Sequence, residues 1–365
     1  MGTGGRCCCR SAQGVGVTVT IKPADLTDRV EAQRIDDFIN GMPGGTPFHL
    51  TGWSRAVERG CGQRSHYLAA EDSCGTIVGV LPLTEVHSPF FGRALVSSGF
   101  AVNGGVLADD PLVAKQLVAR AVELATQLKC PTLELRGGAS PGDDWHVDNT
   151  TYLGFARDLA TDDAAELLAI PRKQRAEVRR ALGFDLEIVT GTNGRAEHYA
   201  VYAESVRNLG TPVFPRALFE SVLDEFGDAA DILTVRYDGK AIASVLSLYW
   251  RGTVMPYWGG GTRKARTFRA NDMMYYALMC HARTQKGCTR FDFGRSKTGT
   301  GPSVYKQHWG FEGEPLTYAS LSVDGGELRD INPMNPKLRL QVAAWQRLPL
   351  WLANRIGPMI SRGLG

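Results

Sequence analysis

The sequence lacks the long apolar run that a membrane-spanning helix needs. Its 365 residues contain no stretch of about 18 consecutive apolar residues. The opening residues, MGTGGRCCCRSAQG, are polar and glycine-rich and have no apolar core of the kind found in a signal peptide. We therefore expect a cytoplasmic protein whose residues 1–16 form a disordered leader.

The motifs of metal and P-loop chemistry are also missing. There is no His-x-x-x-His pair and no clustered set of Asp and Glu, so we expect no metal site. A Gly-x-x-x-x-Gly-Lys-Ser/Thr phosphate loop is also not present. Any catalysis must therefore rest on other residues.

Neither the net charge nor the number of cysteines indicates a particular ligand or cofactor. The net charge of +3 is too small to indicate wholesale nucleic-acid binding, so any basic patch is local. None of the eight cysteines forms a Cys-x-x-Cys pair, which favours reduced, buried thiols. The Cys7-Cys8-Cys9 triplet leaves lipidation or metal binding open beside the disordered leader.

A long-range repeat predicts the fold. SHYLAAEDSCGTIVGVLPLTEV (65–86) resembles ADILTVRYDGKAIASVLSLYWRG (230–252), and each follows an amphipathic helical stretch. Residues 113–138 resemble residues 271–296, with Glu134 matching Asp292. The repeat indicates two copies of an α/β unit with mixed sheets. We predict modules at 17–160 and 165–325, followed by a helical tail at 326–365.

Two stretches between these repeats carry clustered cations. In IPRKQRAEVRRAL (170–182) Arg172, Arg175 and Arg179 share one helix face, which favours an anionic ligand or a solvated basic face. Arg207 ends a helix before a rigid turn, where it could clamp a phosphate or meet the helix dipole.

Two further stretches follow predicted strands. In VMPYWGGGTRKARTFRAND (254–272) we expect Tyr257 and Trp258 to end a strand, and the glycines after them to let a backbone approach a ligand near a helix that starts at about Asn271. RFDFGRSKTGTGPSVYKQHWGFEGE (290–314) places cations and glycines directly after a strand, where α/β proteins bind ligands. Its candidate residues are Asp292, Arg295, Lys297, Tyr305 and Lys306.

These stretches, in this order, resemble the Fem-type aminoacyl and peptidyl transferases, which are built from tandem GNAT-like acyltransferase domains. The resemblance rests on the Arg207-x-x-Gly210 turn, the Tyr257-x-Gly259 strand end, the helix followed by Phe-Asp-Phe-Gly, and Tyr-Lys-x-x-Trp-Gly-Phe. LGTPVFP, FDFGRSKTGTGP, WGFEGEPL and LPLWLANRIGP are more closely similar to FemAB-like proteins that accompany exosortase (PEP-CTERM) systems.

The resemblance implies an enzyme that forms an amide bond on an amine of a cell-envelope or exopolysaccharide-related precursor. It implies that Arg207 holds nucleotide phosphates and that Lys306 meets the substrate peptide or the reacting carbonyl. Together with Lys306, we take Asp292 and Tyr305 as the candidate catalytic residues. The remaining candidates for substrate or phosphate binding are Arg172, Arg175, Arg179, Tyr257, Trp258, Arg295 and Lys297. No resident cofactor is implied, because the acyl donor is a co-substrate.

Three alternatives stay open. The charged coiled-coil arm of some Fem proteins, linked to tRNA handling, has no counterpart here. The donor can therefore be an acyl-CoA, an acyl carrier thioester or an aminoacyl-tRNA. The chain can also be a non-catalytic protein that binds a phosphorylated glycan or lipid, or an N-acyltransferase acting on a lipid amine.

The tail at 326–365 mixes arginine with tryptophan and leucine, as interfacial helices do. We expect Pro349 to end a first tail helix. We predict that this first helix packs on the N-terminal module and closes the two modules together. From Leu350 onward, Trp351 and Arg355 suit a peripheral contact with the inner membrane face.

Overall fold

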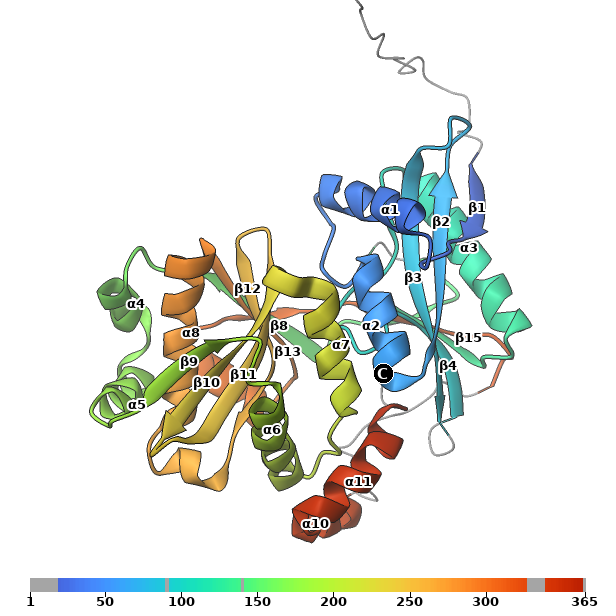
Figure 1. Cartoon of the computed structure of the whole chain (residues 1–365). Helices are drawn as coiled ribbons and strands as arrows, with labels where there is room; N and C mark the ends of the chain where they lie inside the picture. The colour runs from blue at the N-terminus through green and yellow to red at the C-terminus, as the bar shows by residue number, and fades with distance from the viewer. Residues whose placement is uncertain (1–18, 89–91, 139–140, 327–338, 364–365) are drawn as a thin grey trace, which may run out of the picture.

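Two mixed β-sheets stand side by side, each covered by helices, with a pair of C-terminal helices below them (Figure 1). The computed structural model describes residues 19–88, 92–138, 141–326 and 339–363. The two sheets confirm the prediction of a duplicated α/β unit. The leader predicted at 1–16, with its cysteine triplet, lies outside the described residues.

The first sheet has the strand order β1-β2-β3-β4-β6-β15-β7, with β5 paired to β3. All of its strand pairs are antiparallel except β4 with β6, which are parallel. Its strands are β1 (Thr20–Pro23), β2 (Arg64–Glu71), β3 (Ile77–Ser88), β4 (Gly92–Ser97), β5 (Leu107–Ala108), β6 (Thr132–Arg136), β7 (His146–Asp148) and β15 (Tyr318–Ser322).

The second sheet repeats this plan. Read from β9, its order is β9-β10-β11-β12-β13-β8-β14, and only β12 with β13 is a parallel pair. Its strands are β8 (Tyr152–Asp158), β9 (Glu187–Gly191), β10 (Ala230–Tyr237), β11 (Lys240–Trp250), β12 (Thr253–Gly261), β13 (Arg290–Lys297) and β14 (Gly313–Pro315). The matching order and strand directions are those expected of a duplicated unit.

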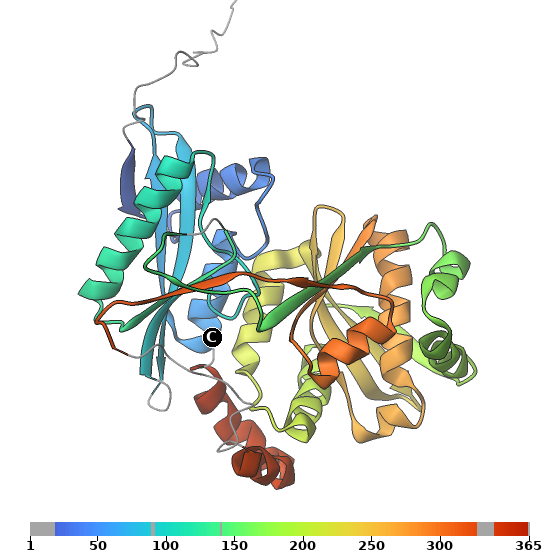
Figure 2. The same cartoon turned by 180° about the vertical axis from the view of Figure 1, so that it is seen from behind.

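The two modules exchange a strand. Strand β8 follows the first module in sequence but pairs with β13 and β14 of the second sheet. Strand β15 follows the second module but pairs with β6 and β7 of the first sheet. Figure 2 shows both connections crossing between the modules. The module limits of 17–160 and 165–325 stay a prediction. Each range contains one strand, β8 or β15, that belongs to the sheet of the other module.

Helices cover the faces of the sheets. Those of the first module are α1 (Arg29–Gly41), α2 (Thr51–Cys61) and α3 (Pro111–Gln127). Those of the second module are α4 (Asp163–Ala169), α5 (Arg172–Leu182), α6 (Arg195–Leu209), α7 (Arg216–Phe226), α8 (Ala270–Lys286) and α9 (Gly301–His308), with 3₁₀ turns η1 (Gly227–Ala229) and η2 (Arg263–Arg266).

Local sequence explains where several helices begin and end. Asp110 caps α3 by accepting a hydrogen bond from the Leu112 N–H, and proline follows it at the first helical position. Asp162 caps α4 by accepting a hydrogen bond from the Ala165 N–H. Gly210 ends α6 in the left-handed conformation that a glycine adopts without strain.

A shared aromatic core joins the modules. Phe48 and Trp53 of the first module pack with Phe226, Tyr257 and Trp258 of the second. A β-carbon at Gly60 in α2 would collide with the backbone of Leu218 in α7, so glycine is what lets these two helices pack closely. The modules therefore share one interior at this boundary.

The tail forms two helices, α10 (Arg339–Arg347) and α11 (Leu350–Ser361). Pro349 separates them, as expected from the clash a proline makes with the preceding turn. The prediction that the first tail helix packs on the N-terminal module is wrong. Helix α10 lies on α6 of the second module, because Val342 packs against Gly210 at the end of that helix. The end of α11 reaches the first module, where Gln63 Nε2 donates to the Arg362 carbonyl.

Candidate functional site

The parallel strands β12 and β13 separate after two residue pairs. Only Thr253 with Arg290 and Val254 with Phe291 are in register. Beyond them β12 stays paired with β11 as far as Gly261, while β13 stays paired with β8 as far as Lys297. Strands β12 and β13 therefore separate from each other, while β12 stays hydrogen-bonded to β11 and β13 stays hydrogen-bonded to β8.

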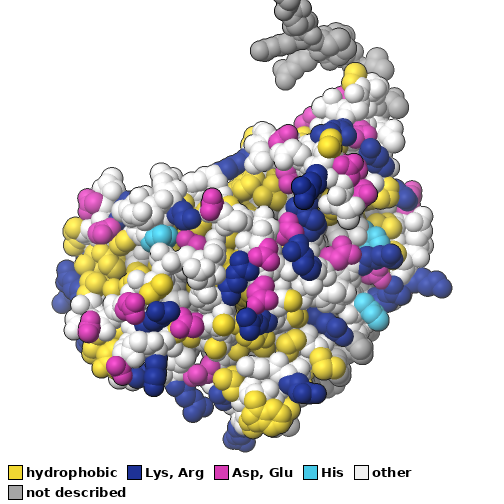
Figure 3. All heavy atoms as spheres, in the orientation of Figure 1, with side chains coloured by type: hydrophobic (Ala, Val, Ile, Leu, Met, Phe, Trp, Pro, Cys, Tyr) yellow, Lys and Arg dark blue, Asp and Glu magenta, His cyan; other side chains and the backbone are white. Residues whose placement is uncertain are grey.

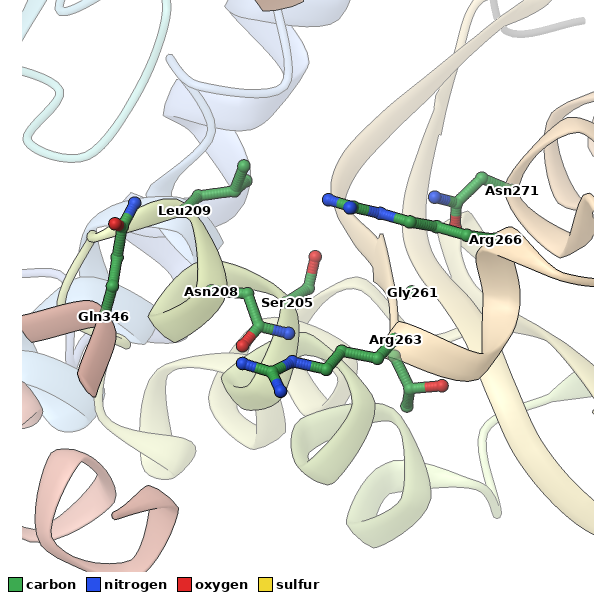
Figure 4. Close-up of a pocket in the computed structure, with 9 residues that line it drawn as sticks. Ser205, Asn208, Leu209, Gly261, Arg263, Arg266, Asn271 and Gln346 are labelled. Carbon is green, nitrogen blue, oxygen red and sulfur yellow. The ribbon is translucent and has the colours of Figure 1, made fainter. Parts of the chain in front are cut away.

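A cavity of about 560 Å³ lies where β12 ends. It is bordered by the second half of α6, by η2, by the start of α8 and by tail helix α10 (Figure 4). Its lining residues are Ser205, Asn208, Leu209, Gly261, Thr262, Arg263, Arg266, Asn271 and Gln346. In Figure 4 the side chains of Arg263 and Arg266 extend from the η2 side into the space facing α6.

The start of α8 offers this cavity an anion-binding terminus. Arg269 at the N-cap is in the left-handed conformation and its side chain does not cap the helix. Within the described residues the N–H groups of Ala270 and Asn271 have no hydrogen-bond acceptor. Free N–H groups and the helix dipole favour negative charge, and the exposed guanidinium groups of Arg263 and Arg266 add to it.

Several buried polar atoms beside the cavity are also unpaired. Asn208 Oδ1, Thr262 Oγ1 and Asn271 Oδ1 are buried and, within the described chain, have no hydrogen-bond partner. The orientation of an asparagine amide is an assignment, so Asn208 and Asn271 can present either oxygen or nitrogen to a ligand. Leaving these polar atoms without a partner costs the folded protein free energy.

The three glycines of this region belong to a strand rather than to the predicted loop. Gly259, Gly260 and Gly261 form the end of β12 and pair with β11. A β-carbon at Gly260 would collide with Ser205 of α6, and one at Gly261 would collide with Asn271 of α8. The glycines thus admit the two helices that shape the cavity.

Lys306 lies on α9 and binds the bulge in β13. Its Nζ donates to the carbonyl oxygens of Gly294 at 3.0 Å and Arg295 at 2.9 Å. The ammonium also lies over the rings of Phe155 and Phe293. Burial lowers the pKa of Lys306 from its usual 10.5 to about 8, and the nearby Asp292 carboxylate opposes that shift.

Asp292 shares this bulge. Its Oδ1 accepts a hydrogen bond of 2.8 Å from the N–H of Gly294, which adopts a left-handed φ of 67°. Burial raises the pKa of Asp292, while the Gly294 hydrogen bond and the charge of Lys306 lower it. The structure therefore brings the predicted residues Lys306 and Asp292 together around one distorted turn of β13.

The other predicted residues of this stretch have protein partners. Tyr305 donates to Asp272 Oδ1 at 3.3 Å, and burial raises its pKa well above the usual value. Arg295 donates to the Tyr318 hydroxyl at 2.7 Å and stacks on Tyr152, whose ring also lies under Lys297. These cations lie at the crossing of the exchanged strands.

Tyr257 and Trp258 are packed inside the protein. Trp258 is 4% exposed and belongs to the aromatic core between the modules. The Tyr257 hydroxyl donates to the Phe100 carbonyl at 2.7 Å. The contacts that the structure shows for them are those of packing, and a binding role for them stays a prediction.

The predicted basic residues lie in two places. Arg207 is next to the cavity-lining Asn208, and its Nη1 donates to the Gln346 carbonyl of α10 at 3.2 Å. Arg172, Arg175 and Arg179 are on α5, which packs on α8; Arg172 and Arg179 are exposed, and Arg175 donates to the Leu168 carbonyl. They do not line the cavity, and their binding role stays a prediction.

The equivalent opening in the first sheet, between β4 and β6, is closed by the chain itself. Residues 99–102 offer four consecutive carbonyl oxygens, and each accepts a hydrogen bond from a side chain. The donors are Trp53 for Gly99, Tyr257 for Phe100, Arg136 for Ala101 and Tyr318 for Val102. The second module is therefore the better candidate for a ligand.

Sequence reasoning identified the stretch 254–272, which contains Arg263 and Arg266, but missed Ser205 and Asn208. These two lie in an ordinary helical stretch, and nothing in their spacing signals a cavity. Their role follows from the packing of α6 across the end of β12.

Comparison with known proteins identifies the fold. FemX superposes with a TM-score of 0.63 at 14% identity, over 79% of this chain and 95% of FemX. A tandem GNAT protein from the clavulanic acid biosynthesis pathway gives 0.56 at 15% identity, over 85% of this chain and 100% of its own. L-PGS from Bacillus licheniformis gives 0.52 at 13% identity, over 87% and 97%. The chain has the tandem GNAT-like fold.

A sequence comparison locates the recognisable domain. Residues 169–307 match the family model described as "Acetyltransferase (GNAT) domain". This segment runs from the end of α4 to α9 and contains most of the cavity lining and Lys306. No curated protein matches the chain.

Proposed function

We propose that this protein is an acyl or aminoacyl transferase that forms an amide bond on an amine of a cell-envelope or exopolysaccharide-related precursor. The observation that carries the proposal is the cavity at the uncapped start of α8, with Arg263 and Arg266 on its rim. A phosphate-bearing acyl donor fits a site of this charge. The match of residues 169–307 to the GNAT domain model supports the same reaction class.

The donor would bind to the second module. Its phosphates would meet the N–H groups of Ala270 and Asn271 and the two arginines, and its acyl arm would enter the opening between β12 and β13. An acyl-CoA or acyl carrier thioester suits this arrangement. An aminoacyl-tRNA remains the other donor that the resemblance to Fem transferases supports.

The reaction needs no covalent enzyme intermediate. The acceptor amine attacks the acyl carbonyl carbon, the carbonyl oxygen gains negative charge, and the thiolate or ribose oxygen leaves with the electrons of its bond to carbon. The amine loses a proton to solvent or to the leaving group. Lys306, held at the bulge of β13 with a lowered pKa, would stabilise the oxygen as a cation.

The acceptor and the cell biology rest on the resemblance. The stretches shared with FemAB-like proteins of exosortase systems support an envelope or exopolysaccharide precursor. Both classes of donor occur in the cytoplasm, which supports a reaction there. A lipid-linked amine is compatible with a tail that contacts the inner membrane face.

The experiment is a titration of acyl-CoA, its non-acylated parent and aminoacyl-tRNA into the protein, with turnover measured by release of free thiol or tRNA. We expect one donor to bind, and the double variant Arg263→Gln, Arg266→Gln to lose that binding. Lys115→Gln, an exposed lysine on α3, is the matched control and should bind normally. Donor binding without turnover on any amine would favour the non-catalytic alternative.

A further inference from the structure

Helix α11 buries a stripe of small residues and exposes two large apolar side chains, which is the reverse of the usual arrangement in a surface helix. Its buried stripe consists of the small residues Ala353, Gly357 and Ser361. Gly357 and Ser361 pack on the segment around Val213, whose carbonyl accepts a hydrogen bond of 2.8 Å from Ser361 Oγ. Two of its large apolar residues point outward, since Trp351 is 70% exposed and Met359 is 55% exposed, whereas its leucines and isoleucines are half-buried.

The outward residues form one face. Trp351, Arg355 and Met359 are spaced four residues apart, so they lie along the same side of the helix, and all three are exposed. Figure 3 shows this end of the molecule with an exposed hydrophobic group flanked by Lys or Arg side chains. An exposed Trp and Met beside an arginine is the composition of a helix that lies in a membrane interface.

Charge separates this segment from the rest of the chain. Residues 331–365 contain five cationic residues, Lys337, Arg339, Arg347, Arg355 and Arg362, and no Asp or Glu. The other 330 residues contain the remaining 36 cations against 38 acidic residues. The positive net charge of the protein therefore resides in its tail, which fits an anionic surface.

We propose that the outward face of α11, made of Trp351, Arg355 and Met359, docks this protein on an anionic lipid bilayer. The twelve residues of α11 span about 18 Å, well short of the roughly 30 Å hydrocarbon core, so the helix lies along the surface. The two apolar side chains enter the headgroup region, and Arg355 pairs with lipid phosphates.

Docking would also orient the candidate active site. Gln346 of α10 lines the cavity, and its carbonyl is bound by Arg207 of α6. A bilayer beneath α10 and α11 therefore lies close to one rim of the cavity. This consequence rests on the proposed function: it selects amine acceptors that are part of a lipid or linked to one.

The test is co-sedimentation of the full chain with two kinds of vesicle, phosphatidylcholine alone and phosphatidylcholine mixed with phosphatidylglycerol. We expect binding to the anionic vesicles only, weakened as salt increases. The double variant Trp351→Ala, Met359→Ala should lower the affinity for anionic vesicles by at least about tenfold. Arg355→Gln should weaken binding by about fivefold.

The matched controls lie on α3 of the first module. Leu112→Ala removes an exposed large apolar side chain, and Lys115→Gln removes an exposed charge. Both should bind like the wild type, and thermal melts should show that every variant is folded.

Three results would overturn the proposal. The first is that the wild type does not bind anionic vesicles. The second is that the α11 variants and the α3 controls bind equally well. The third is that light scattering shows a wild-type dimer which Trp351→Ala converts to a monomer. Vesicle binding needs no acyl donor, so docking without any turnover would contradict the proposed reaction and leave the docking intact.

Discussion

Replacing Lys306 with methionine tests whether the lysine is held as a costly, functional cation. A pKa of about 8 in place of the usual 10.5 corresponds to a cost of about 3 kcal/mol for keeping the charge in the folded state. Lys306→Met removes that cost. It also removes the donor that Lys306 supplies to the carbonyl oxygens of Gly294 and Arg295, a loss of about 1–3 kcal/mol each. At neutral pH the two effects nearly cancel.

The pH dependence separates them. Above the unfolded pKa of 10.5 neither state holds the proton, and below about 8 both states do. Between these values only the unfolded chain binds it, so stability contributed by this site falls as pH falls. Between about pH 7 and about pH 10 the wild type should therefore gain roughly 2 kcal/mol of unfolding free energy relative to the variant.

The assay is urea unfolding followed by tryptophan fluorescence at a series of pH values, compared as wild type minus variant. Lys115→Met is the control, because an exposed lysine should show no such slope. Turnover of Lys306→Met should be strongly reduced at every pH. If the unfolding free energies of the wild type and Lys306→Met change with pH in parallel, the lysine does not carry a desolvated charge. If Lys306→Met is fully active, the lysine has no role in the reaction.

Three more perturbations test other parts of the molecule. Arg263→Gln and Arg266→Gln, made singly, should each weaken donor binding in calorimetry by about 1.5–3 kcal/mol, because each removes a charge-assisted hydrogen bond; unchanged affinity would move the phosphate site elsewhere. Arg175→Gln with Arg179→Gln should weaken binding of an anionic ligand and flatten its salt dependence, and identical salt curves would leave these arginines as a solvated face. Truncation after Asn332 should lower the melting temperature, because the contacts of Val342 and Gly357 with α6 and its following turn are lost, and an unchanged melt would contradict that packing role.

The repeat made the paired architecture predictable. The segments 65–86 and 230–252 form β2–β3 and β10–β11, and the helices before them are α2 and α7. Glu134 and Asp292 lie at matching positions of β6 and β13, each on the strand next to the parallel partner. These elements could be predicted because the hydrophobic periodicity of a helix or strand depends only on its own residues.

The strand exchange could not be predicted in the same way. β8 and β15 have partners more than a hundred residues away, and either strand could satisfy the hydrogen-bonding edge of either sheet. The packing of Tyr257 could not be predicted for a related reason, since nothing local shows that its ring faces the other module. The packing of α10 on α6 depends on the bare surface of Gly210, which a single sequence does not mark as a contact.

The exchange has a consequence for how the site is built. Arg136 of β6 and Tyr318 of β15 belong to the first sheet, and both hold the loop that closes the first opening. Arg295 of β13, whose carbonyl binds Lys306, reaches across to that same Tyr318 hydroxyl. The filled opening of one module is thus tied by hydrogen bonds to the bulge that positions Lys306 in the other. The contacts of the closed first module therefore help to hold the part of β13 whose carbonyl oxygen binds Lys306.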